Sequence, residues 1–142
     1  MTLPNLNPAA LIVATLASFV SGFAWFGPKT FFPVWWRLMG KSPKEAPGGK
    51  TPMGLVFGSV LVGQLLQVIT LALVIGALRD AGVVAGATDG ALVGLLLGFG
   101  IAAGSSLTHR LFAGHGFAVW IIEVGNDIVN AGIAGAILGG WS

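Results

Sequence analysis

Long apolar runs alternate with short polar stretches along this chain. Four runs approach the roughly 20 residues that a helix needs to cross a bilayer, and they cover residues 8–26, 52–78, 89–107 and 117–141. No run alternates with the period of two that marks a half-buried strand, and an open sheet edge cannot satisfy its hydrogen bonds in lipid. The pattern predicts an all-α fold: one membrane domain, residues 1–142, with four transmembrane helices in a bundle.

Polar residues at the ends of the runs predict where the helices begin. Asn7 and Pro8 are typical of a helix cap and first turn. For the second helix we expect Thr51 as the cap, and for the third Thr88 or Asp89.

The basic residues are distributed unevenly over the loops. The first run precedes every Lys and Arg, whereas a signal peptide needs basic residues in front of its apolar core, so we expect a retained span. The only basic residue of loop 79–88 is Arg79. The other two loops contain the remaining basic residues: Lys29, Arg37, Lys41, Lys44, Lys50 and Arg110. The positive-inside rule predicts a multi-pass protein of the bacterial inner membrane, with loop 27–51 cytoplasmic and both termini outside.

Aromatic residues concentrate just after the first run, in the stretch GPKTFFPVWWRLMG. Rings mixed with basic groups are typical of a segment in the headgroup layer. We therefore expect an interfacial amphipathic segment after the first helix, and Trp side chains that anchor the protein at the interface: Trp25, Trp35, Trp36, Trp120 and Trp141.

The composition supports lipid as the surrounding medium. Hydrophobic residues make up 55% of the chain and charged residues 8%, with a mean hydropathy of +0.90; soluble domains have about 25% charged residues. The net charge of +2 and the spacing of the basic residues do not indicate nucleic acid as a partner. The absence of Cys excludes disulfides and Cys metal sites.

Glycines recur every four residues in several runs. Such stripes let membrane helices approach closely, and they predict helix packing by Gly90, Gly94 and Gly98 in the third span and by Gly135 and Gly139 in the fourth. A shorter stripe, Gly54 and Gly58, begins the second span. Two interpretations are open: the stripes pack the bundle internally, or the stripe of the third span makes a homo-oligomer.

The last span carries a polar stripe: Glu123, Asn126, Asp127 and Asn130. The spacing i, i+3, i+4, i+7 places these side chains on one face of a helix. Polar side chains at similar depth occur in the second span, at Gln64 and Gln67, and in the first, at Thr15, Ser18 and Ser21. We expect the bundle to gather these groups into one polar layer.

Acids at this depth need partners, because a charge at the bilayer centre costs at least about 2.5 kcal/mol. We expect Asp127 to be protonated or hydrogen-bonded to an amide at neutral pH, and Glu123 to reach Arg110 or a His. Three interpretations remain: the stripe fixes helix packing; it lines a path for protons, cations or a small solute; or it binds a pigment, quinone or lipid.

The two histidines, His109 and His115, flank the last short loop. Each could act as an interfacial proton relay or a ligand, but two His without a third ligand at standard spacing are a weak metal signal, and we predict no metal site. Nucleophile motifs, phosphate-binding loops and metal-binding helix signatures are missing from the sequence. We expect no enzymatic activity and no cofactor.

Several positions together give the chain a family likeness. The sequence resembles the DUF1761 family of small bacterial integral membrane proteins of unknown function at Asn7, Trp25, Phe26, Pro28, Phe32, Trp36, Gly40, Trp120, Gly135, Leu138 and Trp141. The resemblance covers nearly the whole chain and implies a four-helix membrane protein. It implies no activity and no site residues, and it does not assign the acids Glu123 and Asp127 to the family pattern, so whether they are particular to this protein stays open.

These observations favour a non-enzymatic membrane protein that acts by helix packing, as a homo-oligomer or as an accessory subunit with other membrane subunits. The alternative is a small proton- or cation-coupled channel or transporter that uses the polar stripe.

Overall fold

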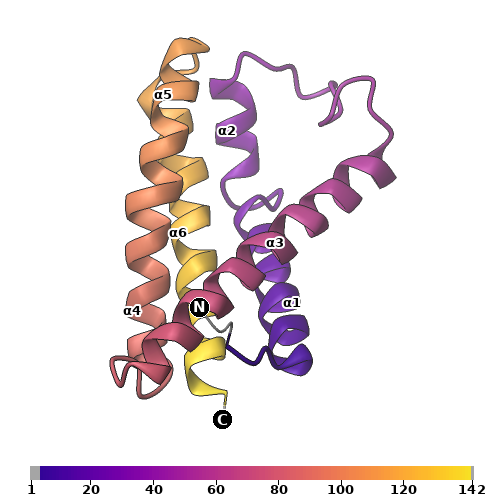
Figure 1. Cartoon of the computed structure of the whole chain (residues 1–142). Helices are drawn as coiled ribbons and strands as arrows, with labels where there is room; N and C mark the ends of the chain where they lie inside the picture. The colour runs from indigo at the N-terminus through magenta and orange to yellow at the C-terminus, as the bar shows by residue number, and fades with distance from the viewer. Residues whose placement is uncertain (1–3, 142) are drawn as a thin grey trace.

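A computed structural model describes residues 4–141 of the chain, and within this range it contains helices and no strand. Four stretches are long and apolar enough to cross a membrane, which confirms the predicted fold class. Figure 1 shows their arrangement. The elements are α1 (Pro8–Trp25), α2 (Phe32–Leu38), α3 (Met53–Asp80), α4 (Ala87–Leu97), the π-helical segment η1 (Gly98–Ala103), α5 (Gly104–Phe112) and α6 (Gly116–Gly140).

The helix starts agree only in part with the prediction. Asn7 caps α1 as expected, because its Oδ1 accepts hydrogen bonds from the backbone N–H groups of Ala9 and Ala10 at 2.9 and 3.2 Å. The caps predicted for the next two spans are wrong. Pro52 precedes α3 without a side-chain cap, and its carbonyl accepts from the backbone N–H groups of Leu55 and Val56 at 2.9 and 3.1 Å.

The start of the third span is also earlier than predicted. The residue before α4 is Gly86, so Thr88 and Asp89 lie inside the first turn. Asp89 still accepts a hydrogen bond, at 2.9 Å from the backbone N–H of Ala85. An acid in the first turn is favourable there because it faces the positive end of the helix dipole.

The third span is longer than the predicted 89–107 and is not a uniform α-helix. It runs from Ala87 to Phe112 through α4, η1 and α5. The prediction ended it too early because Thr108, His109 and Arg110 look like loop residues. In the structure these polar residues are helical, and Arg110 pairs with an acid on α6.

Helix α6 lies at the centre of the fold, in contact with α1, α2, α3 and the whole third span. Its closest neighbour is α4, where glycines of both helices meet. A Cβ added to Gly90 would overlap the carbonyl oxygen of Gly135 and lie 2.7 Å from the Cα of Gly139. The same holds for Gly94, whose Cβ would overlap the Ala131 carbonyl. These glycine stripes therefore pack the bundle internally, and the stripe of α4 is not free to form an oligomer.

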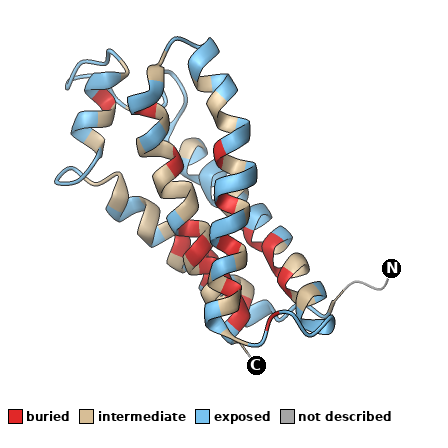
Figure 2. Cartoon of the chain, turned by 90° about the vertical axis from the view of Figure 1, so that its left-hand side faces the viewer, coloured by how far each residue is buried: buried red, intermediate tan, exposed pale blue. Residues whose placement is uncertain are grey.

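The apolar core occupies one end of the bundle, as the buried residues in Figure 2 show. It joins α1, α3 and α6 near the turn between α3 and α4. Its fully buried members include Ala14, Val68 and Ile75, and it extends to Leu138. At this end Arg79 donates hydrogen bonds to the carbonyls of Leu138 and Gly139 at 3.0 and 2.7 Å, two of the carbonyl groups that the C-terminus of α6 leaves without helical partners.

The other end of the bundle is open. Helix α3 crosses the bundle obliquely, and its first half extends away from the other long helices (Figure 1). From Met53 to Leu66 most of its side chains are exposed on all sides, whereas Val68, Leu71 and Ile75 further along are buried. Only the second half of α3 is therefore fixed by packing within the chain.

Candidate functional site

A half-open cleft of about 490 Å³ lies where α3 diverges from the third span, with α6 at its base. Its lining is apolar toward the core and polar toward the open end of the bundle. The polar side chains come from three elements: Gln64, Gln67 and Thr70 from α3, Ser105, Ser106 and His109 from α5, and Asp127 from α6. A volume of this size is within the usual range for small-molecule sites.

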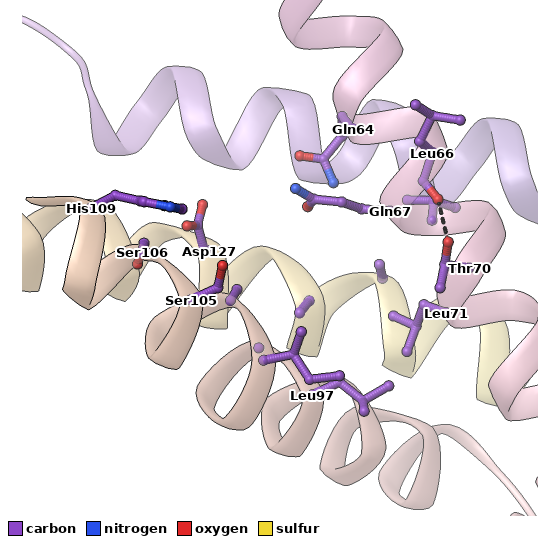
Figure 3. A pocket seen from close by; sticks show the side chains of 16 residues that line it. Gln64, Leu66, Gln67, Thr70, Leu71, Leu97, Ser105, Ser106, His109 and Asp127 are labelled. Carbon is purple, nitrogen blue, oxygen red and sulfur yellow. Dashed lines mark hydrogen bonds between the residues drawn. The ribbon is translucent and has the colours of Figure 1, made fainter.

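Asp127 is the acid of this cleft. In Figure 3 its carboxyl group and the imidazole of His109 extend toward one another across the space between α6 and α5. Within the part of the chain that the structure describes, the ion pairs involve Glu45 and Glu123 and do not involve Asp127. Asp127 therefore presents its oxygens to the cleft rather than to a fixed cationic partner.

The amides of Gln64 and Gln67 face the cleft from the opposite wall (Figure 3). Figure 3 marks one hydrogen bond between lining residues, which the Thr70 hydroxyl donates to the Leu66 carbonyl at 2.9 Å. This bond runs along α3 and does not cross the cleft. The side chains that line the two walls are thus held apart, with hydrogen-bonding capacity left for a ligand, water or a partner.

The π-helical segment forms part of the cleft wall through Gly98, Ile101 and Ala102. Two side chains contact the backbone carbonyl at the end of this segment. The carbonyl of Ala103 accepts from the indole of Trp120 at 3.2 Å and from the hydroxyl of Ser106 at 3.3 Å. These contacts help to set the direction of α5 after η1, and therefore the position of the polar side chains of α5 in the cleft.

Glu123, one turn along α6, makes a separate cluster. Its Oε2 lies 2.6 Å from Nε of Arg110, and its Oε1 accepts from the indole of Trp35 at 2.9 Å. His115 lies 3.2 Å from the same guanidinium. The prediction that Glu123 reaches Arg110 is confirmed. The acid ties α2, α5 and α6 together, and it is not among the residues that line the cleft.

Asn126 and Asn130 face α1 instead. Asn130 donates to the Asn126 side chain at 3.3 Å, and the Ser18 hydroxyl donates to the Asn130 carbonyl at 3.3 Å. Gly22 lies against both amides, since a Cβ there would be 3.5 Å from Asn130 Nδ2. Among the described residues, the buried oxygens Thr15 Oγ1 and Asn130 Oδ1 have no hydrogen-bond partner.

The structure divides the predicted polar layer into separate groups: Gln64 and Gln67 share the cleft with Asp127, and Ser18 bonds to Asn130. The four residues share one face of α6, but this helix is central, so its face meets several neighbours. Asn126 and Asn130 pack on α1, Glu123 ties α2 to α5, and Asp127 lines the cleft.

The two predicted relay histidines also lie in different places. His109 lines the cleft, and His115 contacts Arg110. No group of three metal-ligating side chains occurs within residues 4–141.

Most of the predicted interfacial Trp side chains use their indole N–H inside the protein. Trp25 donates to the carbonyl of Ile122 at 3.0 Å and Trp36 to that of Ser42 at 2.8 Å, while Trp35 and Trp120 make the bonds described above. Trp141 packs against the core. Interfacial anchoring by these residues stays a prediction.

The sequence prediction missed the hydroxyls of the cleft. Thr70, Ser105 and Ser106 all line it. A signal for them existed: Gln67 and Thr70 are three residues apart, as are Ser106 and His109, a spacing that places each pair on one helix face.

Comparison with known proteins gives a family and no function. Residues 9–139 match the family described as "Protein of unknown function (DUF1761)". Neither the curated proteins nor the solved structures gave a match to this chain. The match confirms the resemblance inferred from the sequence and covers nearly the whole fold, from the start of α1 to the end of α6. The chain belongs to the DUF1761 family.

Proposed function

We propose that the protein is a non-enzymatic membrane subunit that acts by packing its helices against further transmembrane helices, as a homo-oligomer or as an accessory subunit of a larger membrane complex. The observation that carries the proposal is the first half of α3, residues 53–66, which extends away from the other long helices and is mostly exposed (Figure 1).

The surface of this half-helix suits helix packing. Around Gly54 and Gly58 nothing lies within 4 Å of an added Cβ, so the backbone is open to close approach. Membrane helices associate through such small-residue surfaces. Large apolar side chains flank the glycines, and Leu55 and Val62 are about 60% exposed (62% and 58%).

The length of α3 supports the same proposal. Its 28 residues make a helix of about 42 Å at about 1.5 Å per residue, longer than the roughly 30 Å hydrocarbon core. Such a helix must tilt, and helix tilt is set by packing against neighbours. Because the first half extends away from the other long helices of the described chain, we infer that a helix of a second chain packs against it.

The test is the mass of the purified protein in mild detergent and in native nanodiscs. We expect wild type to run as a defined assembly, and the double variant Gly54→Leu, Gly58→Leu to lose at least one partner. Gly104→Leu is the matched control, because Gly104 is equally open but lies on α5, and this variant should keep the wild-type mass. A monomeric wild type in native nanodiscs would overturn the proposal.

The same measurement separates the two forms of the proposal. A mass that is a multiple of one chain indicates a homo-oligomer. Co-purifying membrane proteins that the double variant loses, and the control retains, indicate an accessory subunit.

A second candidate function is a proton- or cation-coupled channel or transporter, which the acid in the cleft favours. The cleft does not continue through the bundle, because Val68, Leu71 and Ala134 close its inner end with apolar side chains. Transport would therefore need a conformational change. Reconstituted wild type should carry a proton flux that Asp127→Asn abolishes; absence of flux in wild type would remove this candidate.

For the orientation, we infer from the positive-inside rule that the loop between α2 and α3 is cytoplasmic and that both termini lie outside. The loop carries Lys41, Lys44 and Lys50, whereas the turn between α3 and α4 follows Arg79. This assignment puts the mouth of the cleft on the cytoplasmic side.

A further inference from the structure

The geometry points to the cleft at Asp127 as a binding site for an amphipathic organic amine: a protonated amino group bound by Asp127, attached to an apolar body that lies between α3 and the third span. This inference concerns a ligand of the single chain. It does not depend on the oligomer proposed above.

Charge selects the class of ligand. None of the 16 lining residues is Lys or Arg, and the nearby Arg110 is already paired with Glu123. Among these lining residues, His109, which extends toward Asp127 (Figure 3), is the side chain that can gain a positive charge, so the acid faces no permanent cation. A cation is attracted to this site, and an anionic headgroup such as a phosphate is disfavoured by Asp127.

The hydrogen-bonding groups fit an ammonium head. A protonated primary amine is a donor with three N–H groups and no acceptor. It can donate to the Asp127 carboxylate and to amide or hydroxyl oxygens nearby. Gln64, Gln67 and Ser105 present such oxygens around the same space (Figure 3), and no hydrogen bond between lining side chains occupies them.

The apolar part of the cleft fits the body of the ligand. Beyond the polar mouth, Leu71, Leu97 and Ile101 line the cleft together with small residues of α6. Because the cleft is half-open between two helices that are long and apolar enough to span a membrane, a ligand dissolved in the bilayer can enter from the side. An amphipathic molecule therefore matches both the polar mouth and the apolar base.

The experiment compares three probes of nearly one shape: naphthylmethylamine, naphthylmethanol and naphthoate. Equilibrium dialysis measures how much of each is retained by nanodiscs that hold the protein, relative to empty nanodiscs of the same lipid. We expect excess retention of the amine only. Equal retention of the alcohol, or preferential retention of the carboxylate, would overturn the inference.

Asp127→Asn should weaken binding of the amine by about tenfold or more, because the ammonium loses its charged hydrogen-bond acceptor. Asp80→Asn is the control: it removes an acid at the other end of α3 and should leave binding unchanged. If Asp127→Asn binds the amine like wild type, the site is not this cleft.

A second variant tests the inference even if Asp127→Asn fails to fold. Ser105 is exposed and lines the cleft, so Ser105→Trp should fold and fill the mouth while Asp127 stays in place. We expect loss of the amine signal with an unchanged melting temperature. Retained binding in a folded Ser105→Trp protein would contradict the inference. None of these outcomes depends on the mass of the assembly.

Discussion

At the scale of single residues, Glu123 shows how an acid is accommodated inside this fold. It accepts a hydrogen bond from Trp35 and pairs with Arg110, and the two charged side chains are only 14% and 34% exposed. We expect Glu123→Gln to destabilise the protein by about 1–2 kcal/mol, because a partly buried charged hydrogen bond is lost while the exposed fraction of Arg110 limits the cost. Thermal unfolding in nanodiscs measures the change.

Glu45→Gln is the matched control for that prediction. Glu45 also pairs with a cation, Lys41, but both side chains are about half exposed (50% and 44%). Exposed pairs contribute little, so unfolding should change much less than in Glu123→Gln. Equal effects of the two substitutions would mean that the contacts of Glu123 do not stabilise the fold.

Glu45 provides a pH-dependent prediction in the loop before α3. The backbone N–H of Ser42 donates to its carboxylate at 2.8 Å and, with the positive charge of Lys41, lowers the pKa of Glu45 below its usual value. A lowered pKa in the folded state means that the stabilisation is present above the unfolded pKa and is lost as the pH falls through the folded pKa.

Carboxyl chemical shifts measured by NMR should therefore show Glu45 titrating below an unstructured Glu. Lys41→Gln should retain most of the shift, because the backbone hydrogen bond is its main cause. A titration at the ordinary pH of Glu would show that the Ser42 hydrogen bond is absent in solution.

At the scale of elements, the contact between α4 and α6 depends on the absence of side chains. A Cβ on Gly94 would overlap the backbone of Ala131, and a backbone cannot move aside as a side chain can. We expect Gly94→Ala to cost about 1–3 kcal/mol, the usual cost of overpacking, in spite of the better helix propensity of Ala.

The control for that substitution is Gly104→Ala, where an added Cβ meets nothing within 4 Å. There the propensity gain should leave stability unchanged or raise it by up to about 1 kcal/mol. Chemical denaturation in mixed micelles compares the two variants. If Gly94→Ala is as stable as Gly104→Ala, α4 and α6 are not in close contact.

The sequence predicts these elements better than it predicts their contacts. Apolar runs locate the spans, because any span needs enough apolar residues to cross lipid. The glycine spacing of Gly90, Gly94 and Gly98 predicts a close helix contact, but it does not name the partner. The polar face of α6 is predicted from spacing alone. Which neighbouring helix each polar residue contacts cannot be predicted in this way, because it depends on how the other helices surround α6.

The oblique course of α3 could not be predicted for a related reason. Its apolar residues surround the helix on all sides, so the pattern indicates no buried face. The early end predicted for the third span has another cause: Thr108, His109 and Arg110 are polar enough to resemble a loop, and their partners on other helices are invisible in the sequence.

At the scale of the whole molecule, the two ends of the bundle should face opposite sides of the membrane. The chain has no Cys, so single cysteines can be introduced as unique labels. We expect an impermeant maleimide to label Val83→Cys in intact cells, and Ala46→Cys only after the membrane is opened. Both positions are exposed. The reverse pattern would invert the proposed orientation, and labelling of both in intact cells would contradict a membrane-spanning bundle.

The π-helical segment has a consequence for the geometry of the whole third span. Each residue advances an α-helix by about 100°, and a π turn takes up more residues than an α turn. Residues 98–103 thus set the rotational phase of α5 relative to α4. If this segment became α-helical with all of its residues kept, His109 and Ser105 would rotate by roughly 100° away from Asp127, while the glycine contact of α4 would stay in place. The orientation of α4, which packs against α6, and the orientation of α5, which lines the cleft, can therefore be changed separately within one span.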